Sequence, residues 1–202
     1  KNAPFCGDGK VNGSEACDNG ASGATDLGAC NPECYGFYEK KTIKPTNNFY
    51  MGGSLGGPAG ADGICQTEFG AGWKAFLVGG PRRATTTPLK GDNPQDWVIQ
   101  KYRYYYNLSG QLIWRTDEIP LLGVHAGQRQ DIYADVFSPG NYPWTGWASD
   151  WTTLPENEAK AQGTCNGWTS GSAGWGNFAL PNLTGSASES CGSSSFILCA
   201  QQ

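Results

Sequence analysis

The stretch Ala59–Val78 reads AGADGICQTEFGAGWKAFLV and holds the first helix and the first buried strand expected in this chain. A helix is expected over residues 59–72, and its last turn is rich in glycine, which favours helix ends. A short buried strand follows at residues 74–78, where the side chains are mainly apolar. The helix prediction depends on four residues that recur at helical intervals: Asp62, Ile64, Cys65 and Phe69.

Further along the chain, aromatic and β-branched residues predict short strands. Residues 102–106 lead through Asn107-Leu108-Ser109-Gly110 into residues 111–114, which predicts a hairpin. Other strands are expected at residues 97–99, 120–123, 143–146 and 195–199. The stretch 139–195 is rich in Gly, Ser, Thr, Asn and Trp, so it predicts long irregular loops. Together these patterns indicate an α+β domain over residues 49–202.

The eight cysteines form two groups, one crowded near the N-terminus and one spread over the rest of the chain. Residues 1–36 contain few Leu, Ile or Val residues, so order there must come from disulfides, a bound cation or both. We expect this segment to be a small disulfide-bonded module, and residues 37–48 to be a connector or a first edge strand. The four crowded cysteines are expected to pair among themselves, with three connectivities open: Cys6, Cys17, Cys30 and Cys34.

Composition and charge exclude several classes of function. The formal net charge is −4, and the basic residues are scattered, which argues against nucleic acid and heparin-like ligands. His125 is the only histidine and no C-x-x-C pair occurs, so no zinc site is expected. No apolar run is long enough to insert into a membrane. An even number of cysteines favours an extracellular or cell-surface location, and we interpret the chain as a mature fragment without its signal peptide.

A set of oxygen-bearing side chains in the N-terminal module suggests a calcium site. Ca²⁺ takes six to eight oxygen ligands in flexible geometry, and Asp, Glu and Asn among tight glycine turns can supply them. The alternative is that these side chains cap turns through local hydrogen bonds. The candidate ligands are Asp8, Glu15, Asp18, Asn19 and Asp26.

The tryptophans provide the second candidate site. Indole faces can stack on sugar rings or on apolar side chains of a protein partner. Trp144 and Trp168 are expected in the core, whereas three other tryptophans lie among Gly, Ser and Asp residues and are expected at the surface. The predicted ligand-binding residues are Trp147, Asp150, Trp151, Trp175 and Asn177.

Residues 50–201 resemble the C-type-lectin-like superfold, most closely its endostatin-like branch in bacterial surface proteins. The motifs that carry this resemblance are Gly53, Gly60-Ala61-Asp62-x-x-Cys65-Gln66, Trp73–Leu77, Trp144-Thr145-Gly146, Cys165-Asn166-Gly167-Trp168-Thr169, Ser190-Cys191 and Phe196–Cys199. The resemblance implies a nested pairing of Cys65 with Cys199 and of Cys165 with Cys191. On the residues alone, sequential pairing of neighbours stays open. The N-terminal module resembles short Asp- and Cys-rich repeats of secreted bacterial and protist proteins, through Cys6-Gly7-Asp8-Gly9 and Cys17-Asp18-Asn19-Gly20.

These observations favour a non-catalytic, adhesin-type recognition module that binds an extracellular protein or glycan through the loops of residues 139–175. The alternative is a structural spacer of a larger surface protein, and a hydrolytic enzyme comes third. Enzyme signals are weak, because no Gly-x-Ser-x-Gly motif accompanies His125. The tripeptides of calcium-dependent lectins are also missing from the sequence, which argues against a calcium-bridged sugar site.

Overall fold

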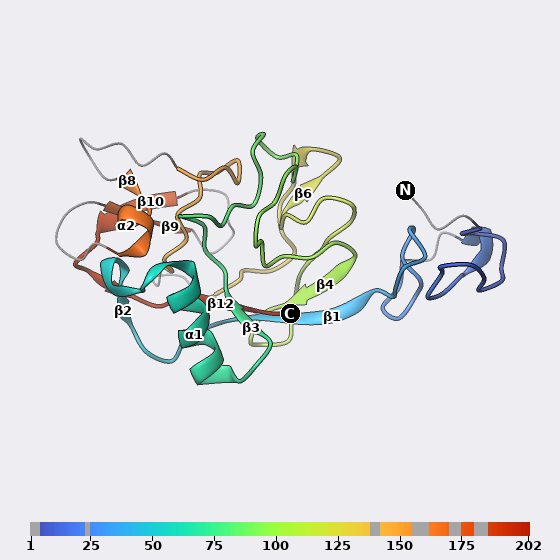
Figure 1. Cartoon of the computed structure of the whole chain (residues 1–202), viewed down its shortest axis with the longest axis horizontal. Helices are drawn as coiled ribbons and strands as arrows, with labels where there is room; N and C mark the ends of the chain where they lie inside the picture. Colours follow the sequence, from blue (N-terminus) through green and yellow to red (C-terminus); the bar gives the residue numbers. More distant parts are fainter. Residues whose placement is uncertain (1–4, 23–24, 138–141, 155–161, 170–174, 180–185) are drawn as a thin grey trace.

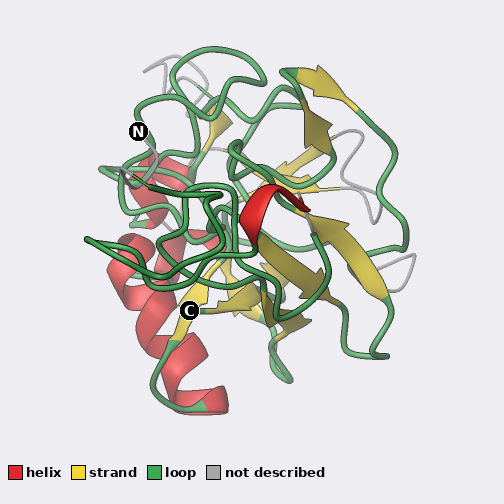
Figure 2. Cartoon of the chain, turned by 90° about the vertical axis from the view of Figure 1, so that its right-hand side faces the viewer, coloured by secondary structure: helices red, strands yellow, loops and turns green. Residues whose placement is uncertain are grey.

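The computed structural model describes residues 5–22, 25–137, 142–154, 162–169, 175–179 and 186–202. These residues form a mixed α+β structure, as the sequence predicts, with loops as its most abundant component (Figure 2). The largest sheet has five strands in the order β3-β12-β1-β4-β5. Their bounds are β1 Glu39–Pro45, β3 Trp73–Ala75, β4 Arg103–Tyr106, β5 Leu112–Arg115 and β12 Leu198–Gln201.

Smaller elements surround this sheet. The helices are α1 Gly57–Phe69 and the short α2 Cys165–Trp168, with 3-10 turns η1 Gly20–Ser22 and η2 Gly52–Ser54. The remaining strands are β2 Tyr50–Met51, β6 Val124–His125, β7 Gln128–Arg129, β8 Gln162–Gly163, β9 Trp175–Ala179, β10 Ser186–Ser190 and β11 Ser194–Ser195. They form small sheets in the orders β10-β9-β8, β11-β2 and β6-β7. Within the described ranges, no helix has the length and apolar character needed to cross a membrane.

Strand β1 lies at the centre of the large sheet. It pairs antiparallel with β12 and parallel with β4, and Ile43 at its middle is fully buried. A strand is therefore present within residues 37–48, as one of the two expected alternatives had it, but its expected position at the edge of the sheet is wrong. Its lysines suggest an edge, but their long stems can lie along apolar surface while the charge stays near water. The Lys40 ammonium, for example, lies 4.5 Å from the centre of the Tyr106 ring on the neighbouring strand.

Helix α1 confirms the helix expected from the opening motif, with shifted ends. Pro58 lies in its first turn, where the missing N–H costs nothing. The helix ends at Phe69 because Gly70 adopts a φ of 94°, which favours glycine, and its N–H bonds to the carbonyl oxygen of Gln66. Asp62 is buried on the sheet side of the helix and accepts a hydrogen bond of 2.8 Å from the N–H of Ala75 in β3.

The predicted hairpin is confirmed, and three of the other expected strands are not. In residues 143–146 only Trp144 forms a bridge, an isolated one to Ile197. Strands β4 and β5 pair antiparallel with Tyr105 opposite Trp114. Residues 97–99 and 120–123 are largely buried but form no strand. They contact each other instead, since the Trp97 indole N–H donates to the carbonyl oxygen of Pro120 at 2.8 Å. Short apolar runs fit a packed loop as well as a strand, so their periodicity could not separate the two.

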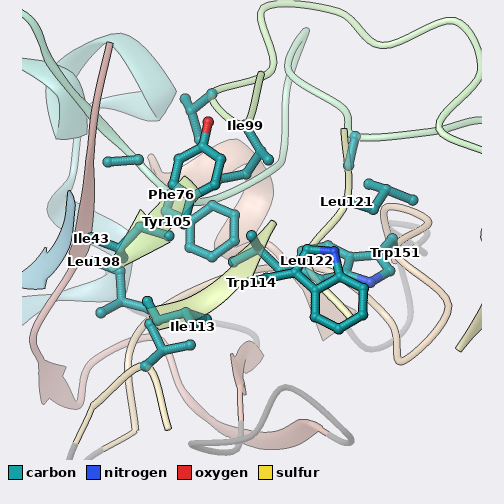
Figure 3. Packing of buried hydrophobic residues seen from close by; sticks show 14 of the residues in the cluster. Ile43, Phe76, Ile99, Tyr105, Ile113, Trp114, Leu121, Leu122, Trp151 and Leu198 are labelled. Atoms are coloured by element: carbon teal, nitrogen blue, oxygen red, sulfur yellow. The ribbon is translucent and has the colours of Figure 1, made fainter. Parts of the chain in front are cut away.

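The hydrophobic core has two main clusters. The larger one joins side chains of β1, β4, β5 and β12 to Phe76, Leu122 and Trp151 from the loops (Figure 3). The second surrounds Trp144 and Trp168 together with two disulfides. Both of these tryptophans are fully buried, as expected.

Four disulfides cross-link the chain. Cys65 in α1 bonds to Cys199 in β12, and Cys165 bonds to Cys191, which confirms the nested pairing. The N-terminal cysteines pair among themselves as Cys6–Cys34 and Cys17–Cys30, which is also a nested arrangement. The helix, the last strand and the irregular region between them are thus held covalently.

The N-terminal module lies beyond the start of β1, and α1 and α2 lie toward the other end of the molecule (Figure 1). The module contacts the domain through tyrosines of the large sheet and its preceding loop. The Tyr102 hydroxyl donates to the Glu33 carboxylate at 3.3 Å, and the Tyr104 hydroxyl donates to the carbonyl oxygen of Thr25. The buried Tyr38 ring packs edge-on against both tyrosines. These contacts fix the module on the sheet.

Candidate functional site

The structure places two of the predicted binding tryptophans in the core, so the prediction that they are exposed is wrong. Trp147 and Trp151 are only 2% and 1% exposed. Their ring centroids lie 4.6 and 5.9 Å from that of Phe76, and 5.0 Å from each other. The Gly, Ser and Asp residues around them suggest a surface loop. However, the polarity of neighbouring residues does not show where each large side chain of that loop points.

The other predicted binding residues do not form a site with them. The Asp150 carboxylate accepts hydrogen bonds from the N–H of Thr152 at 3.0 Å and from its hydroxyl at 2.6 Å, so it caps the turn that carries Trp151. Trp175 and Asn177 lie on β9, but their side chains are outside the described part of the structure. The described residues therefore bring no predicted aromatic surface together.

A pocket of about 410 Å³ lies instead where the end of β1, the β4–β5 turn and the segment before residue 138 meet. Its volume falls within the range of roughly 300–1,000 Å³ that is common for ligand pockets. We name it the Phe49–Phe196 pocket. Its apolar side chains are Pro45, Phe49, Leu108, Val136, Phe137 and Phe196, and its polar ones are Thr46, Asn107, Ser109, Gln111 and Asp135.

Three phenylalanine rings form the aromatic part of this pocket. Phe196 is 5% exposed, and its ring centroid lies 5.5 Å from Phe137 and 6.4 Å from Phe49, both with edge-on geometry. Phe49 itself is 62% exposed, and Leu108 at the hairpin turn is 70% exposed. Large apolar side chains grouped around a hollow are typical of interaction sites, whereas single exposed ones are not informative.

The polar side of the pocket is held by the hairpin turn. The Asn107 amide donates to the Gln111 side-chain oxygen at 3.0 Å and to the carbonyl oxygen of Asp135 at 2.9 Å. Its own oxygen accepts from the N–H of Gln111 at 2.9 Å. Gly110 allows this turn because its φ is 76°. Asn107 therefore fixes both the turn and the segment that carries Asp135, so that the pocket is formed before any ligand arrives.

Sequence reasoning missed this pocket because its lining comes from four segments far apart in the chain. One signal was present. Leu108 is a large apolar residue at the tip of a predicted hairpin turn, where polar residues and glycine are usual.

The comparison with known families concerns most of this domain. The profile of the family described as "Protein of unknown function (DUF1554)" matches residues 48–184. The chain belongs to the DUF1554 family. A search of curated proteins found no match. The DUF1554 match includes Phe49, the hairpin turn and Asp135, and it excludes Phe196 and the N-terminal module.

The predicted calcium ligands lie in the N-terminal module, outside the DUF1554 match, and only some of them are close to one another. Oxygens of Glu15 and Asp18 lie within 4.8 Å of each other and of the Cys34 sulfur, but this sulfur is part of a disulfide. Asp8 and Asp26 are not in this group, and the Asn19 side-chain amide donates to the carbonyl oxygen of Cys30 at 3.1 Å. Two of the carboxylates cap turns: Asp8 accepts from the N–H of Lys10 at 2.8 Å, and Glu15 from that of Asn12 at 3.0 Å.

Asp18 also acts as a turn cap. Its carboxylate accepts hydrogen bonds from the backbone N–H groups of Gly20, Gly7 and Asp8 at 2.5, 3.0 and 3.2 Å. Desolvation raises the pKa of Asp18, but these N–H groups outweigh it and hold the pKa below its ordinary value. The carboxylate is thus kept ionised by the backbone, which fits the alternative of local turn capping.

His125 lies apart from the Phe49–Phe196 pocket. Its Nδ1 is 2.6 Å from the Asp117 carboxylate, and its side chain is 64% exposed. Among the described residues, no serine hydroxyl forms a hydrogen bond with His125, so the pair does not extend to a nucleophile there. His125 lies on β6, and Asp117 lies in the segment between β5 and β6, so the pair links these two parts of the surface.

Proposed function

We propose that this DUF1554 chain is a secreted or surface-displayed recognition module that performs no catalysis and binds an extracellular protein through the Phe49–Phe196 pocket. The observation that carries this proposal is the exposure of Phe49 and Leu108 beside a pocket with an aromatic base. Fully burying such a side chain contributes about 1.5–3 kcal/mol. A partner that covers both rim residues would therefore gain a substantial part of a micromolar affinity from them, since that affinity corresponds to about 8 kcal/mol.

The cross-linked scaffold supports the same proposal. Asn107 joins the two polar walls of the pocket, and Phe196 lies close in sequence to the Cys65–Cys199 disulfide. A preformed site loses little conformational entropy when it binds. Disulfides persist in oxidising compartments, which favours a location outside the cytosol.

At the level of fold, we propose that the domain is a member of the C-type-lectin-like superfold in its endostatin-like branch. Two features support this proposal. The nested disulfides match the pairing that the resemblance implies. The motif residues Trp144 and Trp168 lie together in one core cluster, with their rings 5.8 Å apart.

The experiment is a binding screen of the whole chain on an array of extracellular-matrix proteins and glycans, followed by variants. Phe49→Ala and Leu108→Ala should each weaken binding of a positive protein about tenfold, because each removes roughly 1–2 kcal/mol of apolar contact. Phe5→Ala is the matched control, since Phe5 is a phenylalanine that is 56% exposed in the N-terminal module. Thermal unfolding of all three variants should stay close to that of the parent chain.

The screen also separates the other functions. Absence of any ligand supports a structural spacer and contradicts the proposal. Glycan binding that disappears with EDTA supports a calcium lectin. Protein binding that Phe49→Ala leaves unchanged places the site elsewhere on the molecule.

A calcium ion in the N-terminal module is a second proposal, favoured by one observation. The Glu15 Oε1 and Asn12 Oδ1 atoms are buried acceptors that have no hydrogen-bond donor among the described residues. With Asp18, these oxygens could hold a cation whose remaining ligands are water, because Ca²⁺ accepts water freely. Calorimetric titration with CaCl₂ tests this. Binding that Glu15→Gln removes supports the ion, and no heat of binding overturns it.

A further inference from the structure

The charge of the Phe49–Phe196 pocket points to the kind of side chain that it accepts. Of the residues that line it, Asp135 alone is charged, and the rest are apolar or neutral polar. Asp135 is exposed, and in the described part of the structure no ion pair joins it to a basic side chain. The pocket thus combines aromatic rings with one unneutralised carboxylate.

The lysines of the adjoining strand β1 do not neutralise this carboxylate because they contact other groups. The Lys44 ammonium lies 3.9 Å from the centre of the Phe69 ring and 4.4 Å from that of Trp73. Lys40 lies over Tyr106. The same contacts show that a basic side chain on an aromatic face is a stable arrangement in this fold, where it contributes about 0.5–1 kcal/mol at exposed sites.

The backbone that carries the Asp135 carboxylate is held in place beside the pocket. Its backbone oxygen accepts the hydrogen bond from Asn107, and the next two residues, Val136 and Phe137, are 1% and 7% exposed. This anchored backbone keeps the Asp135 side chain among the residues that line the pocket. A ligand that reaches the phenylalanines therefore meets a negative charge at the same opening.

We propose that the pocket accepts an arginine side chain of the extracellular protein partner, with its aliphatic stem against Phe49 and Leu108 and its guanidinium at the Asp135 carboxylate. This proposal rests on the proposed function of the pocket. Arginine fits this lining because its stem is apolar, its planar head stacks on aromatic rings, and its N–H groups pair with a carboxylate. The net charge of −4 also favours a basic partner at long range.

The test compares two capped tripeptides of nearly the same shape, acetyl-Gly-Arg-Gly-amide and the same peptide with citrulline, whose neutral urea group replaces the cationic guanidinium. Each is titrated into the whole ¹⁵N-labelled chain, and the amide signals of Ser109, Gln111 and Asp135 are followed by NMR. We expect the arginine peptide to bind about fivefold more tightly than the citrulline peptide at low salt, as an exposed ion pair allows. Added salt should reduce this difference, because it screens exposed charges.

The control variants distinguish this proposal from the proposed function. Asp135→Asn should reduce the ratio between the two peptides to below about twofold. Asp131→Asn, which removes an exposed carboxylate of the same segment that does not line the pocket, should leave the ratio unchanged. Equal binding of both peptides, or a ratio that Asp135→Asn does not change, overturns the arginine proposal and leaves the pocket as a binding site. Absence of shifts at the pocket with either peptide, together with an array on which no protein binds, overturns both.

Discussion

Replacing Arg82 with methionine tests how α1, β3 and the following loop are held together. The Arg82 side chain is fully buried and donates two hydrogen bonds to the Asp62 carboxylate, at 2.9 and 2.6 Å. It also donates to the carbonyl oxygen of Ala75 at 3.0 Å and to Asp96 at 3.0 and 2.5 Å. One guanidinium thus joins the helix, the strand and the loop.

The magnitude follows from what Arg82→Met leaves behind. The Asp62 side chain is 12% exposed, so its charge would stay buried without a cationic partner and with only the N–H of Ala75 as a hydrogen-bond donor among the described residues. Breaking a buried ion pair from one side costs about 3–5 kcal/mol of unfolding free energy. The Asp96 side chain is 44% exposed and keeps its contact with Lys74, so it adds little. The double variant Asp62→Asn with Arg82→Met should be about 1–2 kcal/mol more stable than Arg82→Met alone, because no buried charge remains.

The measurement is urea unfolding with the disulfides intact, followed by tryptophan fluorescence. Arg83→Met is the matched control, since Arg83 is the exposed neighbour of Arg82. It should lower the unfolding free energy by less than about 0.5 kcal/mol. The reasoning would be refuted if Arg82→Met lowered the unfolding free energy by less than about 1 kcal/mol. It would also be refuted if the double variant were less stable than Arg82→Met alone.

The remaining predictions concern the core, the cross-links and pH. Trp151→Ala should lower the unfolding free energy by about 3–5 kcal/mol, because Trp151 is buried. Tyr133→Ala, which changes a residue that is 63% exposed, should lower it by less than about 1 kcal/mol. Equal effects in urea unfolding would contradict the burial of Trp151. Replacing Cys65 and Cys199 by alanine should lower the unfolding free energy by about 5 kcal/mol, because this disulfide joins residues 134 positions apart. Replacing Cys165 and Cys191, which are 26 positions apart, should lower it by about 3.5 kcal/mol. Calorimetry that reversed this order would contradict the loop-entropy argument. Hydroxyl groups of Thr85 and Thr87 hold the pKa of Asp92 below its ordinary value of 3.8. The ionised Asp92 therefore stabilises the folded state above about pH 4, and this stabilisation is lost as the pH falls through the folded-state pKa. Asp92→Asn should lower the melting temperature near neutral pH and hardly change it in strong acid.

Local chemistry explains which parts of the fold the sequence predicted. Helix α1 and the β4–β5 hairpin are defined by residues within each segment, such as Pro58, Gly70 and Gly110. The nested disulfides followed from the order of motifs that the resemblance supplied. In each of these cases, the information lies within a few residues or in a recognised spacing.

The failures come from contacts between distant segments. The central position of β1 depends on β12 and β4, and its lysines look exposed until aromatic rings cover their stems. Trp147 and Trp151 are buried because Phe76 and Trp97 form a cluster around them, and these partners lie far away in the sequence. A polar loop composition carries no information about such partners.

The position of β1 also bears on how the proposed binding site is displayed. The N-terminal module joins the start of this strand, where Tyr38 packs on the sheet, and Pro45 at its end lines the pocket. A seven-residue strand spans about 20 Å, so the module and the pocket lie at opposite ends of one central element. Because β1 is hydrogen-bonded on both sides, it holds this separation rigidly. The module therefore does not cover the pocket, and a ligand as large as a folded protein could approach the pocket while the module contacts another part of the surface.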